Sequence, residues 1–193
     1  QMDEVERAIA DADAILSLFA ALLRIAEVES GALKRYFRTF DLSACVAGLV
    51  ESYAPVAEDG GQSLTARITP ALHIAGDPEL VAHVDEDLIV GVVSHAVNNA
   101  VHYTRDRIAL SVRGVDGDGV EIRVEDNGDG FPPALLAAGT PASGVDFLTN
   151  SAGLGLYFAS EVARMHRHRD RVGAVRLENG GRMGGGCFIL TLP

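Results

Sequence analysis

The feature that most constrains the fold is a pair of alternating apolar and polar runs around one glycine-rich turn. The runs are RIALSVRGV (107–115) and GVEIRVED (119–126), and DGDG (116–119) joins them. Alternation with a period of two is typical of half-buried strands, and an Asp-Gly turn between two such runs predicts a hairpin. Long helices and mostly antiparallel strands are predicted in mixed order along the chain. We therefore expect an α+β fold with helices covering one face of a sheet.

The remaining elements follow from the same periodicities. Further strands are predicted over residues 35–40, 63–69, 79–85, 174–179 and 187–193. Helices are predicted over residues 42–58, 86–103 and 154–167. A polar segment rich in Pro and Gly (131–152) predicts a long loop before the last helix.

Residues 2–29 are predicted to form a long helix that Gly31 ends. Its apolar residues recur at alternating steps of three and four, and a second apolar stripe runs beside this heptad seam. One helix cannot bury both stripes alone, and their combined width suits a four-helix bundle. We therefore divide the chain into a bundle helix over residues 1–31 and an α/β domain over residues 35–193.

Composition excludes several classes of protein. The 16 basic residues against 27 acidic ones argue against a general nucleic-acid binder. The basic run RMHRHRDR (164–171) is interpreted as a solvated helix end, with an anion-binding patch as the alternative. Apolar runs are too short to span a bilayer and no signal peptide is visible. We expect a cytoplasmic protein, with membrane anchoring of a longer parent left open. Cys45 and Cys187 are expected to be buried free thiols.

The first feature with chemical potential is SHAVNNAVHYT (94–104). His95, Asn99 and His102 follow at steps of four and three, so they project from one face of the predicted helix. Such a polar line is often the solvent side of a helix. Here the flanking residues are largely apolar, and a buried amide needs a partner. A hydrated cation or a phosphate would serve.

The second feature is DNGDG (126–130). Asp126 ends a predicted strand, and Gly128 and Gly130 permit close backbone approach or a positive φ. A carboxylate there can accept hydrogen bonds from an exocyclic amine, although a plain turn would read similarly. The spacing and the distal Glu of a Ca²⁺ loop are absent.

The third feature is SAGLGLYF (151–158), where a loop becomes a helix. Gly153 and Gly155 expose backbone amides and the positive end of the helix dipole to an anion. The pattern is neither a dinucleotide fingerprint nor a P-loop, and the chain has a single lysine, Lys34.

Together the three features closely resemble the ATP-binding domain of sensor histidine kinases. NAxxYT on a helix, DxGxG after a strand, a variable loop and GLGL opening a helix occur here in that order. The wider superfamily, with gyrase, the mismatch-repair ATPases and the heat-shock chaperone ATPases, shares this Bergerat fold. LLRIAEVESGAL (22–33) is similar to the second helix of the kinase dimerisation domain, and GGGCFILTLP (184–193) to the closing strand of the ATP-binding domain.

The resemblance implies a role for each site residue. Asn99 would coordinate the Mg²⁺ that bridges the ATP phosphates, and Asp126 would accept the adenine amine. Tyr103 would line the adenine pocket, with Gly128 and Gly130 shaping its wall.

On the phosphate side, the resemblance implies that His102 stands where the family usually has Lys or Arg. Segment 131–152 would be the ATP lid, with Phe147 a remnant of its Phe box. The phosphates would be held at the helix start by Gly153, Leu154 and Gly155.

Four departures from the family pattern bear on activity. His95 stands where ATP-hydrolysing relatives place a Glu base, which favours a kinase over a hydrolase. Ser151 replaces a glycine, and the lid is short and poor in basic residues. No histidine lies in the H-[DE]-x-x-[TN]-P setting of the phospho-acceptor, so we expect the first dimerisation helix to be missing and assign no catalytic residue to this chain.

The interpretation is therefore a fragment of a two-component sensor histidine kinase. It would bind Mg-ATP and pass the γ-phosphate to a His on the missing helix. From that His the phosphoryl group would be transferred to an Asp of a response-regulator receiver domain. A homodimer would form through the N-terminal helix. The alternatives are a degenerate, non-catalytic nucleotide-binding scaffold module and an ATPase of the wider superfamily.

Overall fold

The computed structural model describes residues 63–68, 85–115, 119–138 and 151–193. It also describes isolated helical positions: Leu23, Gly48, Glu51, Ser52, Ala54 and Pro55. These positions fall within the two helices expected over 2–29 and 42–58. The rest of those helices, the strand expected over 35–40, most of that over 79–85, and Cys45 lie outside the described residues.

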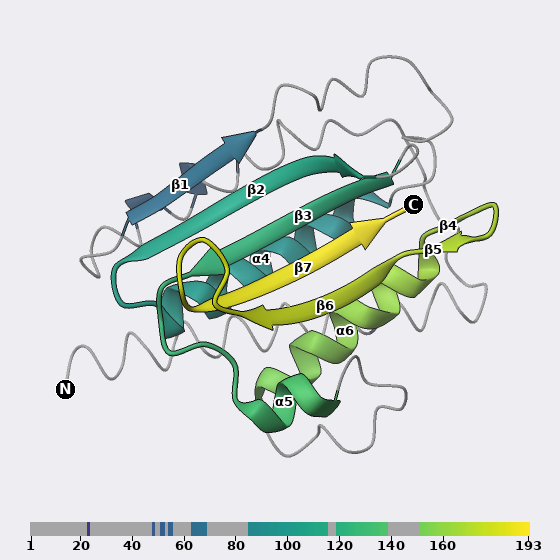
Figure 1. The fold of residues 1–193 in the computed structure, drawn as a ribbon. Helices are drawn as coiled ribbons and strands as arrows, with labels where there is room; N and C mark the ends of the chain where they lie inside the picture. The colour runs from purple at the N-terminus through teal and green to yellow at the C-terminus, as the bar shows by residue number, and fades with distance from the viewer. Residues whose placement is uncertain are drawn as a thin grey trace.

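A five-stranded sheet in the order β1-β2-β3-β7-β6 is the centre of the described structure (Figure 1). Its strands are β1 (Ser63–Ile68), β2 (Arg107–Val115), β3 (Gly119–Asp126), β6 (Ala174–Asn179) and β7 (Gly186–Leu192). β1 and β2 are parallel, and all other neighbours are antiparallel. The predicted hairpin is confirmed, since β2 and β3 pair from Ile108↔Asp126 to Val115↔Gly119.

Two long helices cover one face of this sheet. Figure 1 shows α4 (Glu86–Tyr103) and α6 (Ser151–Met165) behind the strands. Their apolar residues and the strand residues facing them form one core, which includes Leu88, Ile89, Val97, Leu110, Ile122, Phe158, Val162 and Leu190. The α+β class predicted from the sequence, with helices on one face of a mostly antiparallel sheet, is confirmed. The long bundle helix before it lies outside the described residues.

The start of α4 is fixed by two interactions of Asp85. Its side chain caps the helix by accepting a hydrogen bond from the Leu88 N–H at 3.3 Å. Its own N–H donates to His166 Nε2 at 3.0 Å, and His166 Nδ1 bonds the Val162 carbonyl at 2.7 Å. Since His166 follows the last turn of α6, the buried imidazole joins the end of one helix to the start of the other.

Two segments differ from expectation. Residues Pro133–Ala138 form a short helix, α5, inside the segment predicted to be a loop. The basic run was interpreted as a helix end, but the helix stops at Met165 and the run continues as a small hairpin of β4 (Arg167–His168) and β5 (Arg171–Val172). The reason is the burial of His166, whose carbonyl accepts the Gly173 N–H at 2.9 Å and turns the chain back.

Candidate functional site

The polar side chains along one face of α4 make some of their hydrogen bonds within the helix itself. Asn99 Nδ2 and His95 Nε2 lie 3.1 Å apart, and both side chains are half-buried. His102 is exposed, and its Nδ1 contacts the Asn98 carbonyl one turn back at 3.2 Å. The predicted common face is therefore present, and its first two members form a pair.

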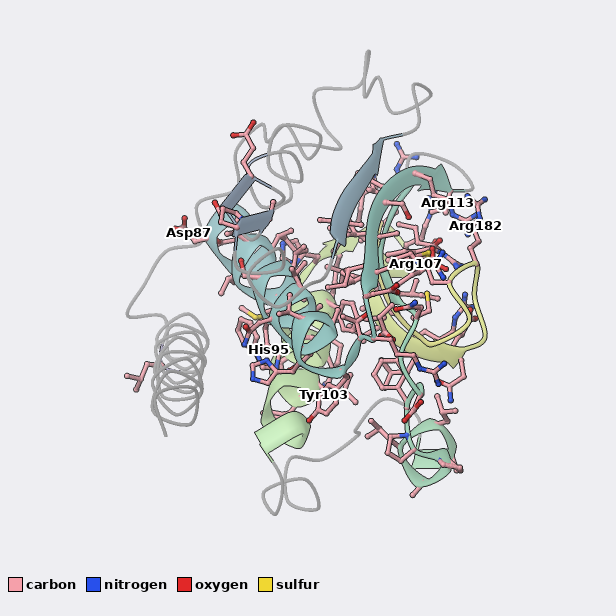
Figure 2. All side chains as sticks on the ribbon, turned by 90° about the vertical axis from the view of Figure 1, so that its left-hand side faces the viewer. Asp87, His95, Tyr103, Arg107, Arg113 and Arg182 are labelled. Atoms are coloured by element: carbon pink, nitrogen blue, oxygen red, sulfur yellow. The ribbon has the colours of Figure 1, made fainter. Side chains whose placement is uncertain are left out.

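His95 also marks where α4 meets α6. A methyl group at Gly155 would overlap the His95 ring, so only glycine allows this approach. Burial lowers the pKa of His95 and keeps its imidazole neutral. A neutral ring can accept the Asn99 amide N–H at Nε2, which leaves Asn99 Oδ1 as the acceptor for another group. Figure 2 shows His95 and Tyr103 on α4, towards the start of α6.

Asp126 is a buried carboxylate at the end of β3, with 8% of its surface exposed. Its Oδ1 accepts the Gly128 N–H at 2.7 Å and the Gly186 N–H at 3.2 Å. No hydrogen bond to Oδ2 is found among the residues that the structure describes. A buried carboxylate oxygen without a donor is costly, so this oxygen is the strongest candidate for a ligand contact.

The glycines of DNGDG serve two different requirements. A side chain at Gly128 would overlap the Tyr103 carbonyl, so Gly128 lets the end of α4 lie against the turn. Gly130 has a φ of 80°, which favours glycine. The Asn179 side chain then brackets Phe131, accepting its N–H at 2.7 Å and donating to its carbonyl at 2.9 Å. The Tyr103 side chain itself is 68% exposed.

At the phosphate end of the expected site, Gly153, Leu154 and Gly155 lie in the opening turns of α6. The helix predicted from residue 154 is thus present, but it already includes Ser151, three residues before the predicted start. Phe147 and residues 139–150 of the expected lid lie outside the described residues. His95, in the middle of α4, is in contact with Gly155. Asp126 and Gly128 lie close together beside the Tyr103 carbonyl, at the C-terminal end of α4.

Sequence reasoning missed several residues that shape this region. Asn127, inside the DNGDG motif, ties the loop after α4 to β3. Asn179 and the loop of residues 180–185 close over the turn. The run of glycines around 180–186 was the available signal, because clustered glycines mark close backbone approach.

The family resemblance implies a bound Mg²⁺, and the described residues offer one suitable protein ligand for it. The described residues contain no group of three or more His, Cys, Asp or Glu side chains able to hold an ion. One amide oxygen, Asn99 Oδ1, is a suitable hard ligand, and Mg²⁺ commonly takes one or two protein oxygens besides substrate phosphates and water.

Comparison with known proteins places the chain in a family. A family model described as histidine kinase-, DNA gyrase B- and HSP90-like ATPase matches residues 84–193, more than half of the chain. The chain belongs to this family. The match begins just before the Asp85 cap and runs through β7, so it contains the whole candidate site of this ATPase domain.

A curated relative of the ATPase domain is the sensor protein KdpD of Escherichia coli (strain K12). It is 27% identical over 180 residues, which cover 89% of this chain and 18% of KdpD. The chain thus spans less than a fifth of that relative's length.

Solved structures confirm the fold. Full-length ShkA in complex with AMPPNP matches with a TM-score of 0.70 and 24% identity, covering 100% of this chain and 38% of ShkA. The Acinetobacter baumannii histidine kinase AdeS matches with a TM-score of 0.61 and 18% identity, over 90% of this chain and 75% of AdeS. The ATPase domain therefore shares its fold with these two proteins.

Two further observations concern the rest of the described chain. None of the described helices is long and apolar enough to cross a membrane. Cys187 is buried and free, as predicted, and burial together with the neighbouring Glu125 raises the pKa of its thiol to about 11.

Proposed function

We propose that this chain binds Mg-ATP and supplies the γ-phosphate to a histidine on a dimerisation helix encoded elsewhere in its parent protein. The observation that carries the proposal is Asp126, whose Oδ1 is held by two backbone N–H groups while Oδ2 has no donor among the described residues. An exocyclic amine of adenine is a donor of the right kind for such an oxygen. The relatives support the choice, since KdpD is a sensor protein and ShkA was solved with AMPPNP.

The remaining site residues take roles around the triphosphate. Asn99 Oδ1 would hold Mg²⁺, with His95 orienting the amide through Nε2. When bound, Mg²⁺ would neutralise charge on the phosphates, which phosphoryl transfer requires. The first turns of α6, which contain Gly153, Leu154 and Gly155, would lie against the phosphates, with the positive end of the helix dipole towards them.

Around the base and the lid, Tyr103, Gly128 and Gly130 would border the adenine, and His102 would lie near the phosphates. Segment 131–152, with Phe147, would close over the nucleotide. α5 gives the beginning of that segment a helical form.

The partners of the intact protein follow from this proposal. Residues 1–31 would pair with a second copy in a dimer, and the phosphohistidine would be read by a response-regulator receiver domain. We place this activity in the cytoplasm, where ATP and receiver domains are found.

The test of nucleotide binding is the substitution Asp126→Asn. Asparagine keeps an oxygen for the backbone N–H groups and replaces the acceptor of the adenine amine with an NH₂ group. A hydrogen bond to a charged group contributes about 1.5–3 kcal/mol, so we expect ATP affinity to fall by about 10- to 150-fold. Thermal shift with Mg-ATP and isothermal titration measure this loss.

Asp129→Asn is the matched control. It makes the same chemical change in the same motif, on a side chain that is 92% exposed and paired with Arg105. It should leave ATP affinity unchanged. Equal losses in both variants, or no ATP-dependent thermal shift in the unaltered chain at millimolar nucleotide, would reject nucleotide binding at Asp126.

Phosphotransfer is tested by mixing the chain with the acceptor helix of its parent and labelled ATP. The kinase proposal predicts an acid-labile phosphohistidine on the acceptor. ATP binding without any phosphoprotein would favour the degenerate scaffold module, and steady phosphate release would favour an ATPase.

A further inference from the structure

The loop between β6 and β7, residues 180–185, links the two faces of the sheet. Figure 1 shows it arching over the face turned away from α4 and α6. The loop closes on itself through the Gly180 N–H, which donates to the Gly185 carbonyl at 2.9 Å. Gly180 and Gly184 have φ values of 92° and 88°, which favour glycine. Its shape is therefore set by backbone hydrogen bonds and glycines.

This loop contacts two consecutive carboxylates at the end of β3. Successive strand residues point to opposite faces, so Glu125 and Asp126 lie on opposite sides of the sheet. On the helix side, the Gly186 N–H donates to Asp126 Oδ1 at 3.2 Å. The Gly185 N–H donates to the backbone carbonyl of Asp126 at 3.0 Å. On the other side, the Arg182 N–H donates to Glu125 Oε1 at 3.0 Å.

Both contacts are close enough to exclude a side chain at Gly181 and at Gly185. A Cβ at Gly181 would stand 2.5 Å from Glu125 Oε1. A Cβ at Gly185 would stand 2.5 Å from Asp126 Oδ1 and from the Gly128 N atom. Real Cβ atoms do not approach neighbours so closely, so the loop is seated on Glu125 and on Asp126 by direct backbone contact.

Glu125 is buried, with 5% of its surface exposed. Within the described part of the chain, the Arg182 N–H is its hydrogen-bond donor. Figure 2 shows Arg182 beyond the sheet, on the side opposite His95 and Tyr103. A buried carboxylate is costly unless it accepts hydrogen bonds, so the loop and Glu125 hold each other in place.

We propose that Glu125 is a positioning residue for adenine recognition, acting through the β6–β7 loop on Asp126. By holding Arg182, it keeps the Gly185 and Gly186 N–H groups against Asp126. The Gly186 N–H then occupies Oδ1 together with the Gly128 N–H, while the Gly185 N–H holds the backbone carbonyl of Asp126. The carboxylate is thereby oriented so that Oδ2 is presented to the base. This inference rests on the proposed function, in which Asp126 receives the adenine amine.

The experiment compares ATP with ITP, whose base carries a carbonyl oxygen in place of the amine. The unaltered chain should bind ATP more tightly than ITP, because the base of ITP lacks the exocyclic amine and would turn a carbonyl oxygen towards Asp126 Oδ2. In Glu125→Ala we expect ATP affinity to fall by about tenfold, the size of a lost hydrogen bond to a charged group. ITP affinity should change by less than about twofold, so discrimination collapses. Glu125→Gln keeps an acceptor for the Arg182 N–H and should therefore keep most of the discrimination between ATP and ITP.

A second pair of variants tests the loop without altering the buried residue. Arg182→Pro removes the N–H that Glu125 accepts, whereas Arg182→Ala keeps it. Only the proline variant should lose discrimination between ATP and ITP. Circular dichroism and urea unfolding show whether each variant is folded, and Glu178→Ala is the control for loss of an exposed carboxylate from the same face.

The outcomes separate the two proposals. If Glu125→Ala and Arg182→Pro lower the affinities for ATP and ITP equally, or keep the original ratio, Glu125 does not position Asp126 and the inference is overturned. If the unaltered chain binds neither nucleotide, the proposed function fails and this inference fails with it.

Discussion

At the scale of single residues, Asn127 shows how one side chain joins two elements of the site. Its Oδ1 accepts hydrogen bonds from Thr104 Oγ1 at 2.9 Å, the Asp106 N–H at 3.1 Å and the Arg107 N–H at 3.0 Å. Its Nδ2 donates to Asp106 Oδ1 at 2.5 Å. The turn that follows α4 is therefore built around the residue next to Asp126.

Replacing Asn127 with Ala should destabilise the protein by about 1–3 kcal/mol, because the Asp106 and Arg107 N–H groups lose their shared acceptor. Asn127→Asp keeps that acceptor and loses only the donor to Asp106, so we expect a smaller loss. Urea unfolding followed by circular dichroism measures both. A loss in Asn127→Asp as large as in Asn127→Ala would mean that the amide donor, and not the acceptor, organises the turn.

At the scale of elements, the start of α6 and the middle of α4 are held together by the absence of a side chain. A methyl group at Gly155 would overlap the His95 ring. On α4, by contrast, a Cβ at Gly91 would lie 3.5 Å from Phe158 Cζ, an ordinary van der Waals distance. The two helical glycines thus differ in what a methyl group would meet.

Gly155→Ala should cost about 1–3 kcal/mol through overpacking. The same change in a His95→Ala background should instead stabilise the helix by about 0.5–1 kcal/mol, the usual gain of alanine over glycine. Gly91→Ala is the control and should be neutral or mildly stabilising. The unfolding free energies of the unaltered domain, the two single variants at positions 95 and 155 and the double variant form a cycle. Additive effects at these two positions would contradict the contact.

At the scale of the whole domain, the two faces of the sheet are stabilised differently. The helix-covered face is apolar, whereas the other carries an ion-pair network in which Glu121 Oε1 lies 2.6 Å from nitrogens of both Arg113 and Arg123. Burial opposes ionisation of Glu121, but hydrogen bonds from Arg113 and Arg123 outweigh it. They hold the pKa of the Glu121 carboxyl below its ordinary value of 4.5.

This network gives the domain an acid-sensitive contribution to stability. Because the pKa of Glu121 is lowered on folding, its contribution is present above the unfolded value of 4.5 and is lost as pH falls through the folded value. We expect Glu121→Gln to reduce stability at pH 7 by about 1 kcal/mol, a modest amount since Arg113 is 52% exposed.

Urea unfolding between pH 7 and pH 3 tests this expectation. The stability difference between Glu121→Gln and the unaltered domain should shrink over the acidic end of that range. Glu178→Gln, at an exposed pair with Arg176, is the control and should show little difference. A difference at Glu121 that does not depend on pH would exclude the ion-pair explanation.

Local patterns in the sequence determined the elements and the family of this chain. The apolar periodicity of residues 86–103 predicted α4, and the alternation on either side of DGDG predicted the β2–β3 hairpin. The helix and the hairpin could be predicted because the spacing of residues along the chain determines which side chains share one face of a regular element. The order of the Asn99, Asp126 and Gly153 motifs indicated the family that the comparisons then showed.

Contacts between distant segments were decided only by the tertiary structure. The buried end of β3, where Asp126 receives the Gly186 N–H and Glu125 the Arg182 N–H, depends on how a loop some 60 residues later folds back over the sheet. His166 likewise ends α6 because it packs against Asp85. No local period encodes such pairings, since packing and hydrogen-bond satisfaction across the whole domain select them. DNGDG by itself is compatible with a plain turn, and it becomes a candidate adenine site because the fold buries Asp126 and leaves Oδ2 without a donor among the described residues.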